Sequence, residues 1–476
     1  MTKKIVQNIT LVLSGNIIFF ILGFIYFAFS ARYFDATDFG IISFAMAINS
    51  LLAVFIAFGT NIFFIREVAK NKSTILKIIP NSMVITFILG AIAFIALTLY
   101  LKLFNYKLNT IFVINIFFLS TIVSSIKGVL DSIFQGLEKP IYTSVGNILN
   151  SILLFLSIIV TQILNLNVIQ FSILYLLVSV IILSYFLLSI SKFVNLKNCF
   201  VIDLNYIKFL MKESWPFAIT YTFVTIYVWT DSIMLSIFKS EAEVGYYNIA
   251  YKMVLALLLI PTGFNTIIYP LLSRYYVEYS ERVNINGILH KYFSIMLIIG
   301  VPIGVGTTIL GDRIIDLIFG PKYTPAAIAL QILIWSLVFT YMNAPFVKLF
   351  ESINLQLLVT KITGFSAFIN VGINYLLVPR YSLVGSSVAT LITEAIVAIS
   401  LMTYAIKLGY FKIDYTEIIK VLIASMLMGL FIVSIYNWNL ILSFLFAMLF
   451  YFIILYMFKT INRSDINFAK SLLDRR

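Results

Sequence analysis

The chain is built from long apolar runs, each of about 20 residues or more, that recur from one end to the other with only short polar breaks. A helix that crosses a hydrocarbon layer needs such a run, because every backbone N–H and C=O group inside the layer must be bonded within the protein. Of the 476 residues, 61% are hydrophobic and only 11% are charged. A water-soluble chain of this size would need more polar surface. The sequence therefore predicts one all-α integral membrane domain.

The positions of the polar breaks predict about fourteen transmembrane helices. The two shortest breaks are Asn165–Leu166–Asn167 and Asn437–Trp438–Asn439, and losing either would change the parity of the count. The expected helix limits are 9–31, 41–65, 80–101, 110–133, 141–164, 167–190, 214–237, 245–271, 291–311, 326–349, 355–378, 383–406, 420–437 and 439–458.

Lys and Arg residues fall mainly in alternate breaks, which is the pattern of cytoplasmic loops. With a cytoplasmic N-terminus, the cytoplasmic side carries Lys3, Lys4, Arg66, Lys70, Lys72, Lys77, Lys192, Lys197, Lys208, Lys212, Arg274, Arg282, Lys459, Arg463, Lys470, Arg475 and Arg476. The opposite side carries only Arg32, Lys102, Lys107, Lys239, Arg313, Lys322 and Arg380. Both termini are therefore expected in the cytoplasm, with the protein in the cytoplasmic membrane. The net charge of +13 is attributed to topological anchors, and no nucleic acid partner is expected.

The residue types needed for redox or zinc chemistry are nearly missing. Cys199 is the only cysteine and His290 the only histidine, so an intramolecular disulfide or a Cys/His metal cluster cannot form. No cofactor is therefore expected. The longest outer break surrounds Arg313–Tyr323, and the cytoplasmic breaks 191–213 and 272–290 are too short for a catalytic domain of the usual size. These lengths argue against a membrane-embedded glycosyltransferase, polymerase or ligase, which would also need paired carboxylates or histidine as acid and base.

Two segments 205 residues apart resemble one another: Phe39–Ala45, which reads FGIISFA, and Val244–Ala250, which reads VGYYNIA. Each follows an expected outer loop, and each glycine opens an even-numbered helix. Six helices separate the copies, and an even number gives both halves the same orientation in the membrane. Parallel repeats are typical of transporters that hold their substrate between the halves and expose it to each side in turn.

Six segments carry a family resemblance, and they fall in order between the expected helices. They read ARYFDATDFGIISFAMAI, IREVAKNK, FQGLEKP, WTDSIMLSIFKSEAEVGYYNIAYKM, LIFGPKYTPAA and INVGINYLLVPRYSLVGSSVAT. Together they resemble the polysaccharide biosynthesis proteins, the Wzx-type flippases of lipid-linked oligosaccharides, within the multidrug/oligosaccharidyl-lipid/polysaccharide exporter superfamily. The resemblance extends over nearly the whole chain to the expected twelfth helix.

The resemblance implies an extruder-like fold of two parallel six-helix lobes plus two C-terminal helices. The lobes would be 1–190 and 214–406, joined by a cytoplasmic linker at 191–213, with the last two helices and a cytoplasmic tail in 407–476. The implied cargo is a polyprenyl diphosphate bearing sugars, moved from the cytoplasmic to the outer leaflet for cell-surface polysaccharide such as the O-antigen of lipopolysaccharide. A polysaccharide polymerase and a chain-length regulator are the partners that this role implies.

Asp231 and Lys252 are ionisable residues at similar expected depth on neighbouring helices, about 10 Å below the outer surface at about 1.5 Å per residue. An ionisable group inside a bilayer usually faces a partner or a watery cavity. One hypothesis makes Lys252 the cation that attracts the substrate diphosphate, with Asp231 restraining it. The other makes the two residues a structural ion pair between helices.

Glu394 is expected near the bilayer midplane, with no cation close to it in the sequence. Such a carboxylate either finds a partner on another helix or takes up a proton. The first hypothesis for Glu394 is a site that couples transport to H⁺ or Na⁺. The second is a neutral carboxyl that bonds to an adjacent helix.

Lys127 and Asp131 stand four residues apart near the cytoplasmic end of the expected fourth helix, so they share a face and can pair. They are expected either to anchor the helix at the membrane interface or to line the mouth of the substrate cavity, which makes Lys127 a candidate substrate-binding residue. Two further pairs have comparable positions: Lys348 with Glu351, and Arg66 with Glu67.

Pro261 and Pro302 fall inside expected helices, where the missing N–H group and a steric clash bend the backbone. Such bends are either fixed or used when the halves open and close. Both interpretations remain open at this stage.

Two alternative cargoes fit the same fold. One is a different lipid-linked precursor, such as lipid II or a teichoic or teichuronic acid precursor. The other is a drug, which would make the protein a cation-coupled multidrug extruder. Such extruders are expected to have about twelve helices and an acidic residue in the first helix. The first expected helix here, 9–31, carries no acidic residue, which favours the flippase.

Overall fold

The computed structural model describes residues 2–194, 202–278 and 282–460. Cys199, part of the expected linker and the expected tail from residue 461 lie outside the described residues. The described residues form fifteen α-helices: α1 (Thr2–Tyr33), α2 (Ala36–Ala57), α3 (Thr60–Lys70), α4 (Ile75–Leu103), α5 (Leu108–Gly136), α6 (Pro140–Ile163), α7 (Val168–Ile190), α8 (Leu204–Phe238), α9 (Glu241–Leu257), α10 (Leu259–Glu278), α11 (Arg282–Phe319), α12 (Ala326–Ser352), α13 (Gln356–Lys407), α14 (Tyr415–Ser434) and α15 (Leu440–Met457). Two 3₁₀ turns accompany them, η1 (Lys72–Thr74) and η3 (Pro321–Tyr323).

Each of the fourteen expected segments overlaps a helix, in chain order. Among the described residues, 12 helical stretches are long and apolar enough to cross a membrane. That count takes α13 once, although non-helical backbone at Ser382 divides it into two stretches. It leaves out α1, whose apolar part Ile18–Tyr33 forms a shorter apolar helix. The protein is therefore an all-helical, multi-pass membrane protein. The count of fourteen spans and the orientation of the termini stay predictions.

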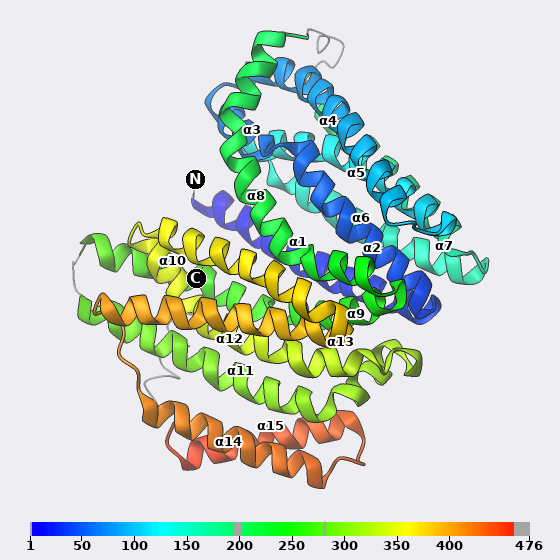
Figure 1. The fold of residues 1–476 in the computed structure, drawn as a ribbon. Coiled ribbons are helices and arrows are strands. Elements are labelled where there is room, and N and C mark those ends of the chain that lie inside the picture. The colour runs from blue at the N-terminus through cyan, green and yellow to red at the C-terminus, as the bar shows by residue number, and fades with distance from the viewer. Residues whose placement is uncertain (1, 195–201, 279–281, 461–476) are drawn as a thin grey trace. The chain divides into compact units, whose positions relative to one another are not determined.

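The described residues divide into two compact units, Met1–Gly245 and Tyr246–Arg476. In the first unit, α1 packs against α6, and α2 and α7 pack against α5. The long helix α8 runs beside α2 and α3 (Figure 1). The two units are defined by which helices pack most densely together. The two six-helix lobes, in contrast, are the parts that are expected to move during transport. The lobe boundaries stay a prediction.

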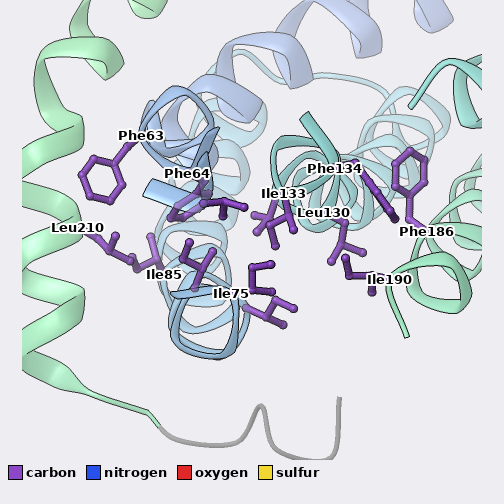
Figure 2. Packing of buried hydrophobic residues seen from close by; sticks show 14 of the residues in the cluster. Phe63, Phe64, Ile75, Ile85, Leu130, Ile133, Phe134, Phe186, Ile190 and Leu210 are labelled. Atoms are coloured by element: carbon purple, nitrogen blue, oxygen red, sulfur yellow. The ribbon is translucent and has the colours of Figure 1, made fainter. Parts of the chain in front are cut away.

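A buried apolar cluster holds together one end of the first unit (Figure 2). It joins α3, α4, α5, α7 and α8, and its larger members include Phe63, Phe64, Phe134, Phe186 and Leu210. Fully burying a side chain of this size contributes about 1.5–3 kcal/mol relative to exposure to water. Inside a bilayer, close packing carries more of that stabilisation. The cluster therefore fixes the helices that bear the polar groups of this unit.

In the second unit, α12 packs against α11 and α13, and the pair α14–α15 packs against α11. The backbone of Ser382 adopts φ 52° and ψ −134°, and this sharp turn folds the two halves of α13 against each other. A Cβ on Gly385 would lie 2.8 Å from the carbonyl carbon of Leu377. Glycine is therefore required at Gly385, because only a residue without a side chain allows this approach.

Just before Pro261 the helix is interrupted, since α9 ends at Leu257 and α10 begins at Leu259. Proline has no N–H group, so the carbonyl four residues earlier loses its helical donor. That carbonyl belongs to Leu257, and it accepts a hydrogen bond of 2.7 Å from the Tyr341 hydroxyl. α11 differs, because it runs through Pro302 as one helix. There the freed carbonyl of Ile298 accepts a hydrogen bond of 2.9 Å from Tyr451.

Candidate functional site

A cluster around Lys127 brings polar groups together within the first unit. The Lys127 amine on α5 lies 3.5 Å from Asp131 Oδ2 and 3.1 Å from the side-chain oxygen of Asn147 on α6. The amine also lies 5.0 Å from the ring centre of Phe186 on α7. The side chains of Lys127 and Asp131 are 21% and 18% exposed. The pairing of Lys127 with Asp131 is thereby confirmed, and three helices contribute to the cluster.

The sequence positions these groups by short-range rules. Spacing of four places Lys127 and Asp131 on one face of α5. Gly146 is one residue before Asn147, and a Cβ at that glycine would lie 2.4 Å from Cε2 of Phe186. The ring can therefore approach α6 closely and reach the lysine. In the described part of the chain, the other Asp131 oxygen, Oδ1, is buried without a hydrogen-bond partner.

Glu394 lies on the second half of α13, in the second unit. Its Oε2 accepts a hydrogen bond of 3.0 Å from Thr340 and one of 3.4 Å from the amide of Asn343, both on α12. The carboxyl group is partly buried. Thr340 and Asn343 are therefore partners of Glu394 on another helix, which is one of the two alternatives expected from the sequence. Whether the group couples transport to an ion stays a prediction.

A second polar network beside Glu394 was not singled out from the sequence. Asn370 donates to Thr393 at 3.3 Å, and Asn374 donates to the side-chain oxygen of Asn370 at 3.1 Å. Ser386 then donates to Asn374 at 3.0 Å, and all four side chains are buried. The two asparagines stand four residues apart in an apolar run, so they share one face of the helix. This spacing is the sequence signal for the network, but neither residue is ionisable.

Asp231 and Lys252 fall in different units. Asp231 lies on α8 in the first unit and is only 2% exposed. Lys252 lies on α9 in the second unit and is exposed. An ion pair between them stays a prediction.

The remaining expected ion pairs are confirmed at helix ends. Lys348 lies 2.6 Å from Glu351, and Arg66 lies 3.7 Å from Glu67. Arg66 also lies 3.5 Å from Glu213 on α8, which joins α3 to that helix. All of these pairs are partly or largely exposed, so each contributes at most about 1 kcal/mol to stability.

The last two helices are joined to α11 by polar contacts near both of their ends. Arg313 donates hydrogen bonds to the backbone oxygens of Tyr436 and Trp438 in the α14–α15 turn. The Tyr436 hydroxyl donates to Asp312 at 2.6 Å. This hydrogen bond raises the pKa of the Tyr436 phenol, and desolvation acts in the same direction. At the other end of α14, Ser294 donates to Glu417.

A multi-pass helical protein with charged and amide side chains held between its helices has the architecture of a membrane transporter. The family is shown by a match to residues 5–276, more than half of the chain: this protein belongs to the polysaccharide biosynthesis protein family. A second family model, MatE, matches residues 216–376. These are transporters of the multidrug/oligosaccharidyl-lipid/polysaccharide exporter superfamily, and not enzymes. The family resemblance of the six sequence segments is confirmed.

The relatives of this chain are distant in sequence. The putative O-antigen transporter of Shigella dysenteriae is 27% identical over 69% of this chain and 81% of its own length. The probable low-salt glycan biosynthesis flippase of Haloferax volcanii is 23% identical over 43% of this chain, and the match spans 44% of the flippase. An uncharacterized membrane protein of Methanocaldococcus jannaschii is 25% identical over 74% of each chain.

Two solved structures show the same fold. A lipid II flippase in an inward closed conformation has a TM-score of 0.72 at 17% identity, covering 96% of this chain and 99% of the flippase. An inward-facing multidrug resistance MATE family transporter has a TM-score of 0.64 at 15% identity, covering 82% of this chain and 93% of the transporter. The extruder-like helical fold is thereby confirmed.

Proposed function

We propose that this protein is a flippase that moves a polyprenyl-diphosphate-linked oligosaccharide from the cytoplasmic to the outer leaflet. The observation that carries this proposal is the extent of the likeness in fold. A match over 96% of the chain cannot omit both α14 and α15, and it covers 99% of a lipid II flippase. The match to the multidrug transporter covers 82% of the chain. Hydrogen bonds of Arg313 and Tyr451 join the last two helices, α14 and α15, to α11. These two helices are therefore an integral part of the second unit.

The Lys127 cluster supplies chemistry suited to an anionic sugar lipid. The amine offers a cation for the diphosphate, and Asn147 offers an amide for sugar hydroxyls. In the structure, Asp131 holds the amine. Substrate phosphate then competes with a carboxylate for the same cation, so binding exchanges one charge-assisted hydrogen bond for another. Such an exchange avoids leaving Lys127 uncompensated at any stage.

Lys252 and Asp231 are the second pair of candidate substrate-binding residues. We propose that Lys252 attracts the diphosphate and that Asp231 restrains it. Lys252 is an exposed residue on an expected membrane helix, and this exposure supports the role.

Glu394 is the candidate coupling residue. Thr340 and Asn343 donate hydrogen bonds to this carboxyl group through neutral side chains. A neutral donor can bond to the charged and to the protonated carboxyl, so these two bonds are compatible with exchange of H⁺ or Na⁺ as the protein changes conformation. We propose this exchange as the way in which an ion gradient drives transport.

The remaining parts of the proposal concern the cell. We place the protein in the cytoplasmic membrane with both termini inside, on the alternation of Lys and Arg in the sequence. A polysaccharide polymerase and a chain-length regulator are the protein partners that a role in polysaccharide export implies. The likeness to the putative O-antigen transporter of Shigella dysenteriae supports O-antigen or related lipopolysaccharide precursors as the cargo.

Two alternatives keep the same fold. The cargo could instead be lipid II or a teichoic or teichuronic precursor, which shares the polyprenyl diphosphate and differs in its sugars. A cation-coupled multidrug extruder is favoured by the MatE match over residues 216–376. Extrusion predicts that loss of the protein raises drug sensitivity and leaves glycolipids unchanged.

The test is depletion of the protein in its native cell, followed by extraction of lipid-linked oligosaccharides. We expect these lipids to accumulate in the cytoplasmic leaflet and surface polysaccharide to fall. Re-expression of the natural protein should restore both. An unchanged amount and leaflet distribution of every lipid-linked sugar would contradict the proposal.

A further inference from the structure

The two copies of the internal repeat touch each other through their glycines. Gly40 and Gly245 occupy equivalent positions in the repeat. A Cβ on Gly245 would lie 3.1 Å from the backbone nitrogen of Gly40 and 2.7 Å from the Ala36 carbonyl oxygen. A Cβ on Gly40 would lie 1.6 Å from the Glu241 carbonyl oxygen. All of these residues belong to the first unit, and we call this region the glycine contact.

Side-chain hydrogen bonds flank the glycine contact. The hydroxyls of Tyr106 and Ser236 share a hydrogen bond of 2.6 Å, which joins the α4–α5 loop to α8. Thr110 donates to the Glu241 carboxylate at 3.3 Å, which joins α5 to the start of α9. Both bonds also lie inside the first unit. The beginning of α9 is therefore held against α2 and α5 by backbone packing and by polar side chains.

The glycine contact joins parts of the two proposed lobes. Gly40 begins the second expected membrane helix, and Gly245 begins the eighth. Each follows an expected outer loop, so the contact lies at the expected outer end of both helices. Backbones approach this closely only where side chains are missing. Packed contacts of this kind have two arrangements, closed or separated, with little between them.

We propose that the glycine contact is the outer seal of the transport pathway, closed when the substrate cavity is open to the cytoplasm and separated when cargo leaves to the outer leaflet. This inference rests on the proposed function, because it assigns the contact a step in alternating access. A methyl group at either glycine would hold the two backbones apart. Gly40→Ala and Gly245→Ala should therefore shift the protein toward the state that is open outward.

The first test measures the seal without any substrate. In a Cys199→Ser background, Val244→Cys gives a reporter at a side chain that is fully buried beside Gly245. A membrane-impermeant maleimide added outside should label it slowly. With Gly40→Ala, labelling should accelerate about tenfold, which corresponds to one decade in the equilibrium between closed and open states. The control is Gly372→Ala, since a Cβ at Gly372 meets no atom within 4 Å, and its labelling should stay slow.

The second test leaves both glycines in place, so it decides the matter if an alanine variant fails to fold. Thr110→Cys and Glu241→Cys, joined by a short reducible thiol cross-linker, hold the seal closed. Transport of lipid-linked oligosaccharide should stop on cross-linking and return on reduction. Full transport by the cross-linked protein, or equal labelling with Gly40→Ala and Gly372→Ala, would overturn the inference. If Gly40→Ala accelerates labelling but the natural protein moves no glycolipid, the proposed function is overturned and the glycine contact is still a seal.

Discussion

The hydroxyl of Tyr341 on α12 donates a hydrogen bond of 2.7 Å to the backbone oxygen of Leu257, the carbonyl that Pro261 deprives of its helical donor. In the same way, the hydroxyl of Tyr451 on α15 donates a hydrogen bond to the backbone oxygen of Ile298, the carbonyl freed by Pro302. In a membrane, water is not available to satisfy such a carbonyl, so a neighbouring helix must do so. Each proline therefore frees a backbone carbonyl that binds a tyrosine hydroxyl of another helix, and Pro261 also lies just after a helix break.

The first prediction concerns this docking point. Tyr341→Phe keeps the buried ring and removes only the hydroxyl, so the Leu257 carbonyl loses its donor. We expect stability to fall by about 0.6 kcal/mol, the average for interhelical hydrogen bonds in membranes, and by about 1.7 kcal/mol at most. Thermal unfolding in detergent measures it. Tyr456→Phe is the control, because Tyr456 is 79% exposed. Equal melting temperatures for the two variants would contradict the assigned role of the hydroxyl.

The second prediction is that Lys127 binds the diphosphate. Lys127→Met keeps an apolar stem and removes the charge, and it should lower transport roughly tenfold to a hundredfold, since a charged hydrogen bond contributes about 1.5–3 kcal/mol. Lys348→Met is the matched control, because Lys348 also belongs to an ion pair near a helix end.

Loss of Lys127 also leaves Asp131 without its cation, which could lower stability by itself. The double variant Lys127→Met with Asp131→Asn removes both charges. We expect it to fold normally and still fail to transport. Normal transport by the folded double variant would make the pair a structural anchor.

The third prediction is that Glu394→Gln separates transport from the ion gradient. Glutamine keeps the shape and can still accept from Thr340, so the amount of folded protein should not change. Transport should lose its response to an imposed H⁺ or Na⁺ gradient. The readout is the transport rate with and without each gradient. An unchanged response to both gradients would make Glu394 a structural link between α12 and α13.

The fourth prediction concerns Lys252 and Asp231. Lys252→Ala should impair transport. If the two residues pair, it should also destabilise the protein, because buried Asp231 then loses that partner. The double variant with Asp231→Ala distinguishes the two effects. A substrate site predicts that folding returns and transport does not. If folding and transport return together, the two residues form a clamp between helices.

Features that depend on local spacing could be predicted from the sequence. The apolar runs predicted the helices, and separations of three or four residues predicted the pairs at Lys127 and Lys348. A disturbance of the helix near Pro261 also followed from the missing N–H group. In each case, the physical cause acts within one helix or between its immediate neighbours.

Features that depend on helix packing could not be predicted in this way. The sequence does not give the register of α6 against α5, so it could not place Asn147 beside Lys127. It likewise could not bring Thr340 to Glu394. Gly40 and Gly245 were matched as repeat positions, but a repeat does not reveal that its copies touch. That contact depends on how α2 meets α9.

Transport of the proposed cargo by the purified protein tests the central claim most directly. The protein is reconstituted into vesicles that contain lipid-linked oligosaccharide from its native cell, and a membrane-impermeant glycan-modifying reagent is added outside. Vesicles with the natural protein should expose their inner-leaflet glycolipid to the reagent over time, whereas protein-free vesicles should keep it protected. The folded double variant of Lys127 and Asp131 should resemble the protein-free vesicles. Equal protection with and without the natural protein, under every ion gradient, would contradict the assignment as a flippase.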